Sequence, residues 1–226
     1  MRSILVIGSS SAIGNAVVAR IRANGDLAFG VDTHGCDITV DFSTTAGRLE
    51  GIESVLEKTS SRIDAIISVS NTNAKKPVAI SANFFGITQF IEGLYEELKD
   101  GISPRISILN YYDECDEISK DLVNGMLHSG ERISLMLAQE LTEQFPELAG
   151  QNYSSSQKAL QIWVQDMAQK SHWKLAGILM NTVTADKTVS SEDVADLLVW
   201  LASSANTSHT GEVFNAKDLA KLRADF

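Results

Sequence analysis

Apolar residues in this chain occur in two patterns that follow one another along the sequence. Short continuous runs, such as residues 3–7 and 63–69, are followed by stretches in which apolar residues recur every three or four positions. Continuous runs are typical of strands buried on both faces, and the longer spacing is typical of amphipathic helices. The regular alternation predicts an α/β fold, a doubly wound parallel sheet with helices on both faces.

The pattern predicts about seven strands and the helices between them. The expected strands are 3–7, 27–32, 37–40, 63–69, 105–109, 175–180 and 213–214. Helices are expected after Gly14, after a cap at Ser43 or Thr44, over 81–98 and 155–168, and from a cap at Ser190 to about 202. Residues 113–150 predict a two-helix insertion after strand 5, over 116–127 and 131–145, whose apolar stripe either packs on the parent domain or contacts another subunit.

The turn after the first strand has the composition of a phosphate site. It reads Gly8-Ser9-Ser10-Ser11-Ala12-Ile13-Gly14 and leads directly into a helical pattern. Glycine lets the backbone approach an anion, and the unpaired N–H groups of a first helical turn point at it. Ala12 stands where a third glycine often occurs, so an ordinary strand–helix turn is the alternative. The candidate contacts are Gly8, Ser10, Ser11, Ile13 and Gly14.

An acidic residue closes the second expected strand. Asp32 follows Gly14 by eighteen positions, and an Asp at about this distance accepts hydrogen bonds from the ribose hydroxyls in dinucleotide-binding units. Its charge repels a 2′-phosphate, so Asp32 favours NAD(H) over NADP(H). Ligand is expected beyond the carboxyl ends of the strands, where Gly8, Asp32, Ser70 and Tyr111 fall.

Composition narrows the classes of partner. The 226 residues carry a net charge of −10 without a basic run, which argues against nucleic acid and anionic membrane as partners. The first strand begins at residue 3 and no apolar run reaches membrane length, so neither a signal peptide nor a membrane span is expected. Cys36 and Cys115 are isolated, as in a cytoplasmic protein, and the four histidines lack metal-ligand spacing, so no metal is expected.

Several motifs together resemble the short-chain dehydrogenase/reductase family over essentially the whole chain, and its bacterial hydroxysteroid dehydrogenase/carbonyl reductase branch in particular. They are the loop 7–14, Gly30-Val31-Asp32, Val40-Asp41-Phe42-Ser43-Thr44, Asn83-Phe84-Phe85-Gly86, Glu192-Asp193-Val194-Ala195, Trp200-Leu201-Ala202-Ser203 and Thr210-Gly211.

The resemblance implies a single Rossmann-type NAD(P)-binding domain over residues 1–226. It also implies NAD(H) as cofactor, hydride transfer between a small carbonyl compound and its alcohol, and a homodimer or homotetramer. Further cofactor contacts follow by resemblance at Asp41, Phe42, Ser70, Asn71 and Thr182.

The catalytic set that the resemblance implies is present only in part. Tyr153 aligns with the family's general acid/base tyrosine and Asn83 with its proton-relay asparagine. The family's lysine position is Gln157, and Lys158 comes one residue late, about 100° around a helix. Tyr111 falls on the family's catalytic serine, next to Asn110. A cation about 5 Å from the phenol would lower its pKa by about two units, so Tyr153 without it stays protonated and favours reduction.

Three hypotheses follow. The first is a divergent NAD(H)-dependent reductase with Tyr153 as acid, Tyr111 or Asn110 orienting the carbonyl, and Asn83 on the relay. The second is a catalytically impaired NAD-binding sensor or partner subunit, which Gln157, Tyr111 and the short segment before Ser190 favour. The third is a Ser154/Lys158 nucleophile, whose i, i+4 spacing occurs often by chance.

Overall fold

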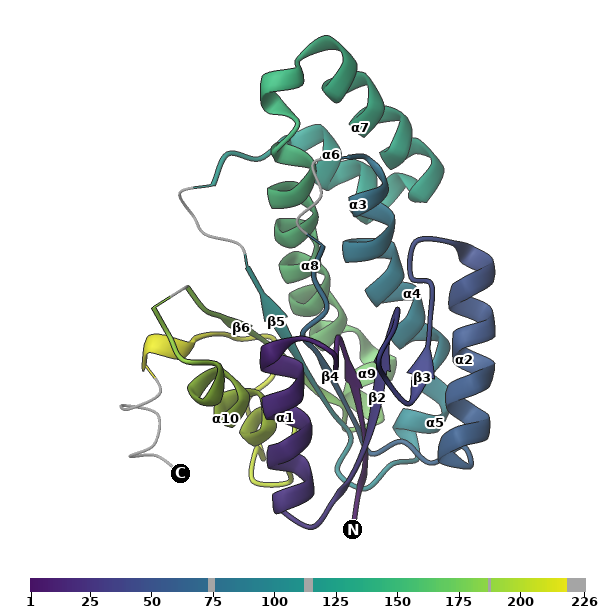
Figure 1. Ribbon diagram of the computed structural model, residues 1–226, viewed down its shortest axis with the longest axis vertical. Helices are drawn as coiled ribbons and strands as arrows, with labels where there is room; N and C mark the ends of the chain where they lie inside the picture. Colours follow the sequence, from purple (N-terminus) through teal and green to yellow (C-terminus); the bar gives the residue numbers. More distant parts are fainter. Residues whose placement is uncertain (73–75, 112–115, 187, 219–226) are drawn as a thin grey trace.

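The computed structural model of the protein describes residues 1–72, 76–111, 116–186 and 188–218. All of its strands belong to one parallel sheet, with the order β3-β2-β1-β4-β5-β6-β7. This confirms the predicted doubly wound, Rossmann-type fold of seven strands (Figure 1). The strands are β1 (Ser3–Ile7), β2 (Leu27–Asp32), β3 (Ile38–Thr39), β4 (Ala65–Ser68), β5 (Arg105–Asn110), β6 (Leu179–Thr184) and β7 (Val213–Asn215).

Helices cover both faces of the sheet because successive strand residues point to opposite sides. Ile4 and Val6 of β1 belong to the cluster under α1 (Ala12–Ala23) and α10 (Ser191–Leu201). Leu5 and Ile7 belong to the larger cluster on the other face. The helices there are α2 (Thr45–Thr59), α4 (Gly86–Gly93), α5 (Tyr95–Lys99), α8 (Gln151–Gln169) and α9 (Ser171–Leu175).

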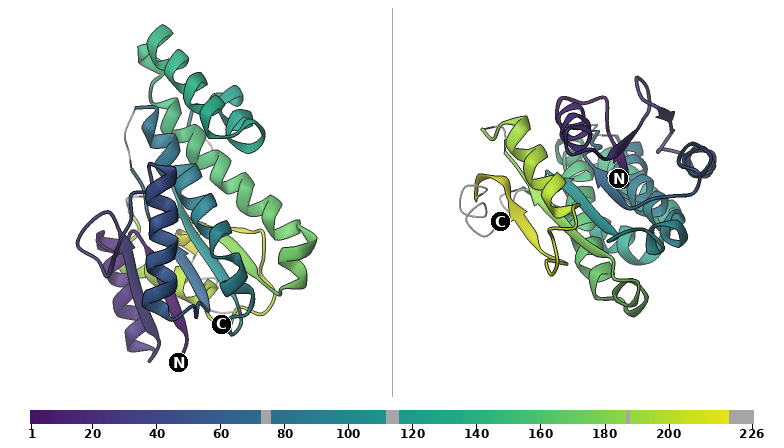
Figure 2. Two further views of the ribbon diagram at one scale, coloured as in Figure 1. Left: turned by 90° about the vertical axis from the view of Figure 1, so that its right-hand side faces the viewer. Right: turned by 90° about the horizontal axis from the view of Figure 1, so that it is seen from below.

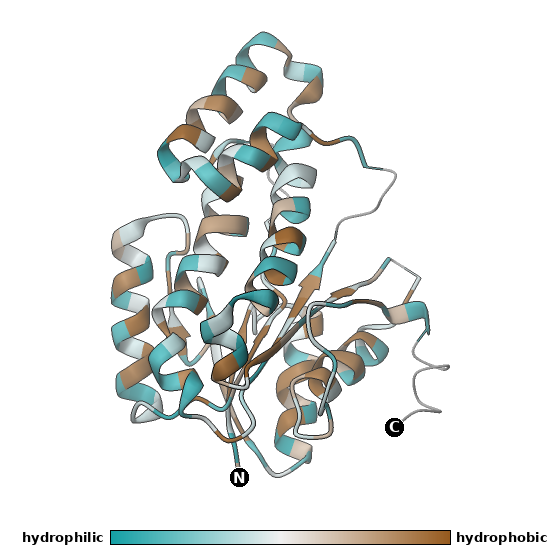
Figure 3. Cartoon of the chain, turned by 180° about the vertical axis from the view of Figure 1, so that it is seen from behind, coloured by the Kyte–Doolittle hydropathy of each residue, from teal (hydrophilic) through white to brown (hydrophobic). Residues whose placement is uncertain are grey.

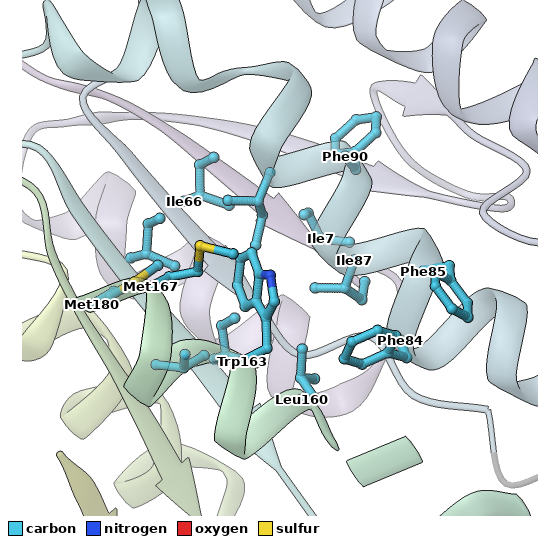
Figure 4. Packing of buried hydrophobic residues seen from close by; sticks show 14 of the residues in the cluster. Ile7, Ile66, Phe84, Phe85, Ile87, Phe90, Leu160, Trp163, Met167 and Met180 are labelled. Atoms are coloured by element: carbon cyan, nitrogen blue, oxygen red, sulfur yellow. The ribbon is translucent and has the colours of Figure 1, made fainter. Parts of the chain in front are cut away.

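Trp163 of α8 lies within the larger cluster. Its ring is surrounded by Ile66 of β4, Ile87 of α4 and neighbouring side chains of its own helix (Figure 4). The indole N–H donates to Glu92 at 3.2 Å, which satisfies the polar atom of a side chain that is 5% exposed. In Figure 3 the strands are predominantly hydrophobic, as expected for a sheet covered on both faces.

The expected insertion is present after β5. It consists of α6 (Lys120–Asn124), a π-helical turn η2 (Gly125–Ser129), α7 (Glu131–Gln144) and a 3₁₀ turn η3 (Pro146–Leu148). Figures 1 and 2 show α6 and α7 at the end of the molecule away from both termini. Leu137 and Leu141 of the predicted apolar stripe pack against the core, whereas Met136 of the same stripe is 58% exposed, so the stripe packs inward along only part of its width.

Three predicted boundaries were wrong. The strand expected at 175–180 is β6 from Leu179, because Ser171–Leu175 forms α9 and Gly177, with φ +69°, makes the turn between them. The helix expected over 81–98 is divided into α3 (Val78–Ile80), the π-helical turn η1 (Ser81–Phe85), α4 and α5. Helix α8 begins at Gln151 rather than Ser155, which places Tyr153 in its first turn.

Two predicted caps are confirmed. The Thr44 hydroxyl accepts from the N–H of Gly47 at 3.1 Å, so Thr44 rather than Ser43 caps α2. The Ser190 hydroxyl accepts from the N–H of Asp193 at 3.1 Å and caps α10.

Candidate active site

The turn between β1 and α1 forms an anion cradle. Gly8 has φ +86°, and a Cβ there would lie 2.6 Å from the backbone nitrogen of Ser70, so this turn lies directly against the loop after β4. The Ser11 hydroxyl accepts from the N–H of Gly14 at 3.0 Å and caps α1. The other N–H groups of the first turn, at Ala12 and Ile13, have no acceptor within the helix. Glycine close approach and these donors fit a pyrophosphate.

Asp32 lies beside this cradle at the end of β2. One carboxylate oxygen accepts from the N–H of Ser10 at 3.0 Å and from its hydroxyl at 2.5 Å, and the other accepts from the N–H of Thr33 at 2.7 Å. The carboxylate is therefore fixed in orientation, and the Ser10 hydroxyl can rotate away to leave its place to a ribose hydroxyl. The residues present fit a dinucleotide with an unsubstituted adenosine ribose.

The remaining predicted cofactor residues lie in different surroundings. Asp41 accepts from the hydroxyl of Ser43 at 2.6 Å, and the hydrogen bonds from Ser43 lower the pKa of Asp41. The Phe42 ring belongs to the core, with its centroid 5.2 Å from that of Phe90, so this side chain is buried away from a cofactor. Thr182 is fully buried inside β6, where its hydroxyl donates to the carbonyl of Glu212 at 3.4 Å.

Tyr153 and Asn71 meet beyond the carboxyl end of β4. The amide nitrogen of Asn71 donates to the phenol oxygen of Tyr153 at 3.0 Å. Burial raises the pKa of Tyr153 to about 12, against the lowering effect of the Asn71 bond. Smaller contributions from nearby Tyr111 and Asp116 are included in this rise. The phenol is therefore protonated at neutral pH and can donate its proton to a substrate oxygen.

Gln157 lies one helical turn beyond Tyr153 and is 1% exposed. Its side-chain oxygen accepts from the N–H of Tyr111 at 3.1 Å, and its carbonyl accepts from the amide of Asn110 at 2.8 Å. Gln157 thus ties the end of β5 to α8 and brings no charge. The ammonium of Lys158 contacts the Gln161 side chain at 3.5 Å, on another side of the helix, as its one-residue offset predicts.

Asn83 lies in the π-helical turn η1 and is 2% exposed. Its amide forms a two-way clamp on the backbone of Thr72, accepting from the N–H and donating to the carbonyl, both at 2.9 Å. The same amide nitrogen lies 3.4 Å from the hydroxyl of Ser156. Asn83 therefore holds the loop that carries Asn71. Sequence reasoning missed this contact with Thr72, since a backbone partner leaves no pattern in the sequence.

An open cavity of about 270 Å³ lies in front of Tyr153. The insertion and the start of α8 supply its walls, which are Asp116, Glu117, Glu147, Leu148, Gly150, Gln151, Tyr153 and Ser154. After β6, Asp186 pairs with Lys217 of η4 (Ala216–Asp218) and accepts from the N–H of Thr188 at 2.8 Å. Lys217 and Thr188 lower the pKa of Asp186 to about 2.

The alternative nucleophile has no support from geometry. The Ser154 hydroxyl donates to the carbonyl of Glu117 at 2.5 Å, so its proton is directed to the backbone and not to a base. Of the two cysteines, Cys36 is a free thiol close to the carbonyls of Asp32 and Ile38, and Cys115 lies outside the described residues. Within the described part of the chain no group of histidine, cysteine and carboxylate side chains could hold a metal, and no helix could cross a membrane.

Known proteins are similar to this chain in sequence and in fold. No family model matches the chain. The 3α-hydroxysteroid dehydrogenase/carbonyl reductase of Comamonas testosteroni is 26% identical over 193 residues, 83% of this chain and 73% of that protein. The crystal structure of a 3α-hydroxysteroid dehydrogenase from Pseudomonas sp. B-0831 with NADH superposes with a TM-score of 0.84 at 23% identity, covering 99% of each chain.

A further solved structure shares the fold. An oxidoreductase of the short-chain dehydrogenase/reductase family from Brucella ovis, in complex with a partially ordered NAD, has a TM-score of 0.68 at 17% identity, covering 95% of this chain and 98% of that one. The seven-stranded parallel sheet of this chain agrees with the similarity in fold. The chain is therefore similar to members of the short-chain dehydrogenase/reductase family in sequence and in fold.

Proposed function

We propose that this protein is an NAD(H)-dependent oxidoreductase that reduces a small carbonyl compound, or oxidises the corresponding alcohol. The observation that carries the proposal is the Tyr153 hydroxyl, which accepts from Asn71 of the loop after β4 at 3.0 Å and belongs to a residue that lines the cavity. The similarity to a hydroxysteroid dehydrogenase/carbonyl reductase and to an NADH complex supports both reaction type and cofactor.

The residues that would hold the cofactor are those of the cradle and its neighbours. The turn from Gly8 to Gly14 would bind the pyrophosphate, and Asp32 would accept from the ribose hydroxyls and exclude a 2′-phosphate. When bound, the nicotinamide supplies or accepts the hydride.

The chain's own residues would handle the proton and the orientation of the carbonyl. Tyr153 would donate its phenolic proton to the carbonyl oxygen. Tyr111 is the better candidate to orient that oxygen, because the Asn110 amide already donates to Gln157. Because the pKa of Tyr153 is raised to about 12, reduction is favoured over oxidation near neutral pH.

Gln157 supports a second function, in which the protein does not catalyse a reaction. This side chain is buried, accepts a hydrogen bond from the N–H of Tyr111 and supplies no positive charge to the Tyr153 phenol. On this second proposal the protein binds NAD(H) without turnover and acts as a sensor or partner subunit. It predicts a change in self-association or partner binding when the cofactor is added.

The experiment is an NADH titration by fluorescence, with NADPH in parallel, followed by NADH oxidation with para-nitrobenzaldehyde and with a 3-oxosteroid as probe carbonyls. Turnover of either probe that Tyr153→Phe abolishes is the expected result. Binding of NADH without turnover of a broad carbonyl panel would favour the sensor. A rate that persists in Tyr153→Phe would overturn the assignment of the acid.

We further propose that residues 1–226 form one domain, since a single sheet runs from β1 to β7, and that the protein is a homodimer or homotetramer. The mass in solution, measured by light scattering with and without NADH, tests the second point.

A further inference from the structure

We propose that Asn71 is a positioning residue for the reaction, which binds the phenol oxygen of Tyr153 and stabilises the negative charge that this oxygen gains when it releases its proton. The inference rests on the proposed function and deepens it, because it identifies a group that acts on the acid where the chain has no lysine.

The geometry places a donor on the reacting atom. Asn71 follows β4 and Tyr153 lies in the first turn of α8, 82 positions later, yet the amide nitrogen is 3.0 Å from the phenol oxygen. The bond uses an acceptor lone pair of the phenol, so the O–H hydrogen remains available for a substrate. The clamp of Asn83 on the Thr72 backbone, next to Asn71, holds the donor in place.

The hydrogen bond changes in strength during the reaction. When the O–H bond of Tyr153 breaks, its electron pair stays on the phenol oxygen and the proton passes to the carbonyl oxygen of the substrate. The acceptor of the Asn71 bond thereby changes from a neutral phenol to a phenolate, and bonds to ionised acceptors are about twice as strong as neutral ones. An interaction that strengthens only as charge develops raises kcat rather than substrate affinity.

The other side chains around the Tyr153 phenol do not supply a positive charge that would stabilise its phenolate. Tyr111 faces it from the end of β5, and Asp116, Glu117 and Glu147 share its cavity from the insertion. All four are neutral or acidic, and Gln157, one helical turn further along α8, is uncharged. Lys158 has its ammonium beside Gln161. Among the described residues, Asn71 is the group seen donating to the phenol oxygen.

The test compares three substitutions at position 71 by steady-state reduction of para-nitrobenzaldehyde with NADH from pH 6 to 10. Asn71→Ala removes the donor, Asn71→Asp keeps the shape but carries an acceptor, and Asn71→Gln keeps the donor on a longer side chain. We expect kcat to fall about fivefold to tenfold in Asn71→Ala and further in Asn71→Asp, with KM within about twofold and partial recovery in Asn71→Gln. Alcohol oxidation should need a higher pH in Asn71→Ala.

Controls separate this inference from loss of structure and from failure of the proposed function. Asn24→Asp, at the exposed end of α1, introduces the same charge and should leave kcat unchanged, and the Tm should match across all variants. An Asn71→Ala enzyme with wild-type kcat, or equal losses in all three variants with an unchanged pH profile, would overturn the inference while Tyr153→Phe remains inactive. An active Tyr153→Phe would instead overturn the proposed acid.

Discussion

Arg48 of α2 and Glu131 at the start of α7 form a two-pronged ion pair across 83 positions of sequence. The guanidinium nitrogens lie 2.5 Å and 3.3 Å from the two carboxylate oxygens. Arg48 is 2% exposed and also donates to the carbonyl of Phe42 at 3.0 Å. One buried side chain therefore connects the loop after β3, where the family resemblance predicts cofactor contacts, to the insertion that forms part of the cavity wall.

Removing the guanidinium should destabilise the protein strongly. We expect Arg48→Met to lower the free energy of unfolding by about 3 kcal/mol, because it leaves Glu131 without its partner in a largely buried position. The double variant Arg48→Met/Glu131→Leu should recover part of the loss, since neither charge remains. Urea unfolding followed by circular dichroism measures both. Equal stability of Arg48→Met and wild type would show that the pair contributes nothing.

Asp32 should control the choice between the two nicotinamide cofactors. We expect Asp32→Asn to weaken NADH binding about tenfold, or about 1.4 kcal/mol, and to weaken NADPH binding less, because the charge that repels a 2′-phosphate is gone. Fluorescence titration with both cofactors gives the ratio. Glu50→Gln, on the exposed side of α2, is the matched charge control and should bind as wild type. An unchanged ratio in Asp32→Asn would contradict the assignment.

Alcohol oxidation should depend steeply on pH. The phenolate of Tyr153 is the base in that direction, and its pKa is raised to about 12, so the fraction ionised grows about tenfold for each pH unit below this value. We expect the oxidation rate to rise from pH 7 to 10 without a plateau, while reduction, which uses the protonated phenol, stays nearly level. A plateau near pH 8 would mean that another group serves as the base.

Placing a positive charge at position 157 should shift the pH dependence of alcohol oxidation. In Gln157→Lys the ammonium would lie one turn from the phenol, and we expect the oxidation profile to shift about two units toward lower pH. The same change removes the acceptor of the Tyr111 N–H and buries a charge, so the Tm should fall. Gln157→Met, which loses the acceptor without adding charge, separates the two effects. A profile that both variants leave unmoved would exclude Gln157 from the site.

The sequence by itself determined the parts of this protein that local patterns encode. Periodicity located six of the seven strands, and Thr44 and Ser190 could be recognised as caps, because a helix start requires a short polar side chain at a particular position. Gly8 and Gly14 indicated the anion cradle between β1 and α1, because the close approach of two backbone segments leaves no room for a side chain at these two positions. Asp32 followed from its position at the end of a strand.

Tertiary structure decided the features that depend on residues far apart in the chain. Nothing in local spacing indicates that Asn71 contacts Tyr153 or that Arg48 contacts Glu131. The π-helical turn at Asn83 and the late start of β6 went unpredicted because helical periodicity tolerates an extra residue, and an apolar run does not show whether Leu175 ends a helix or opens a strand. Packing of distant segments resolves such ambiguities, since burial and hydrogen bonding are satisfied over the whole fold.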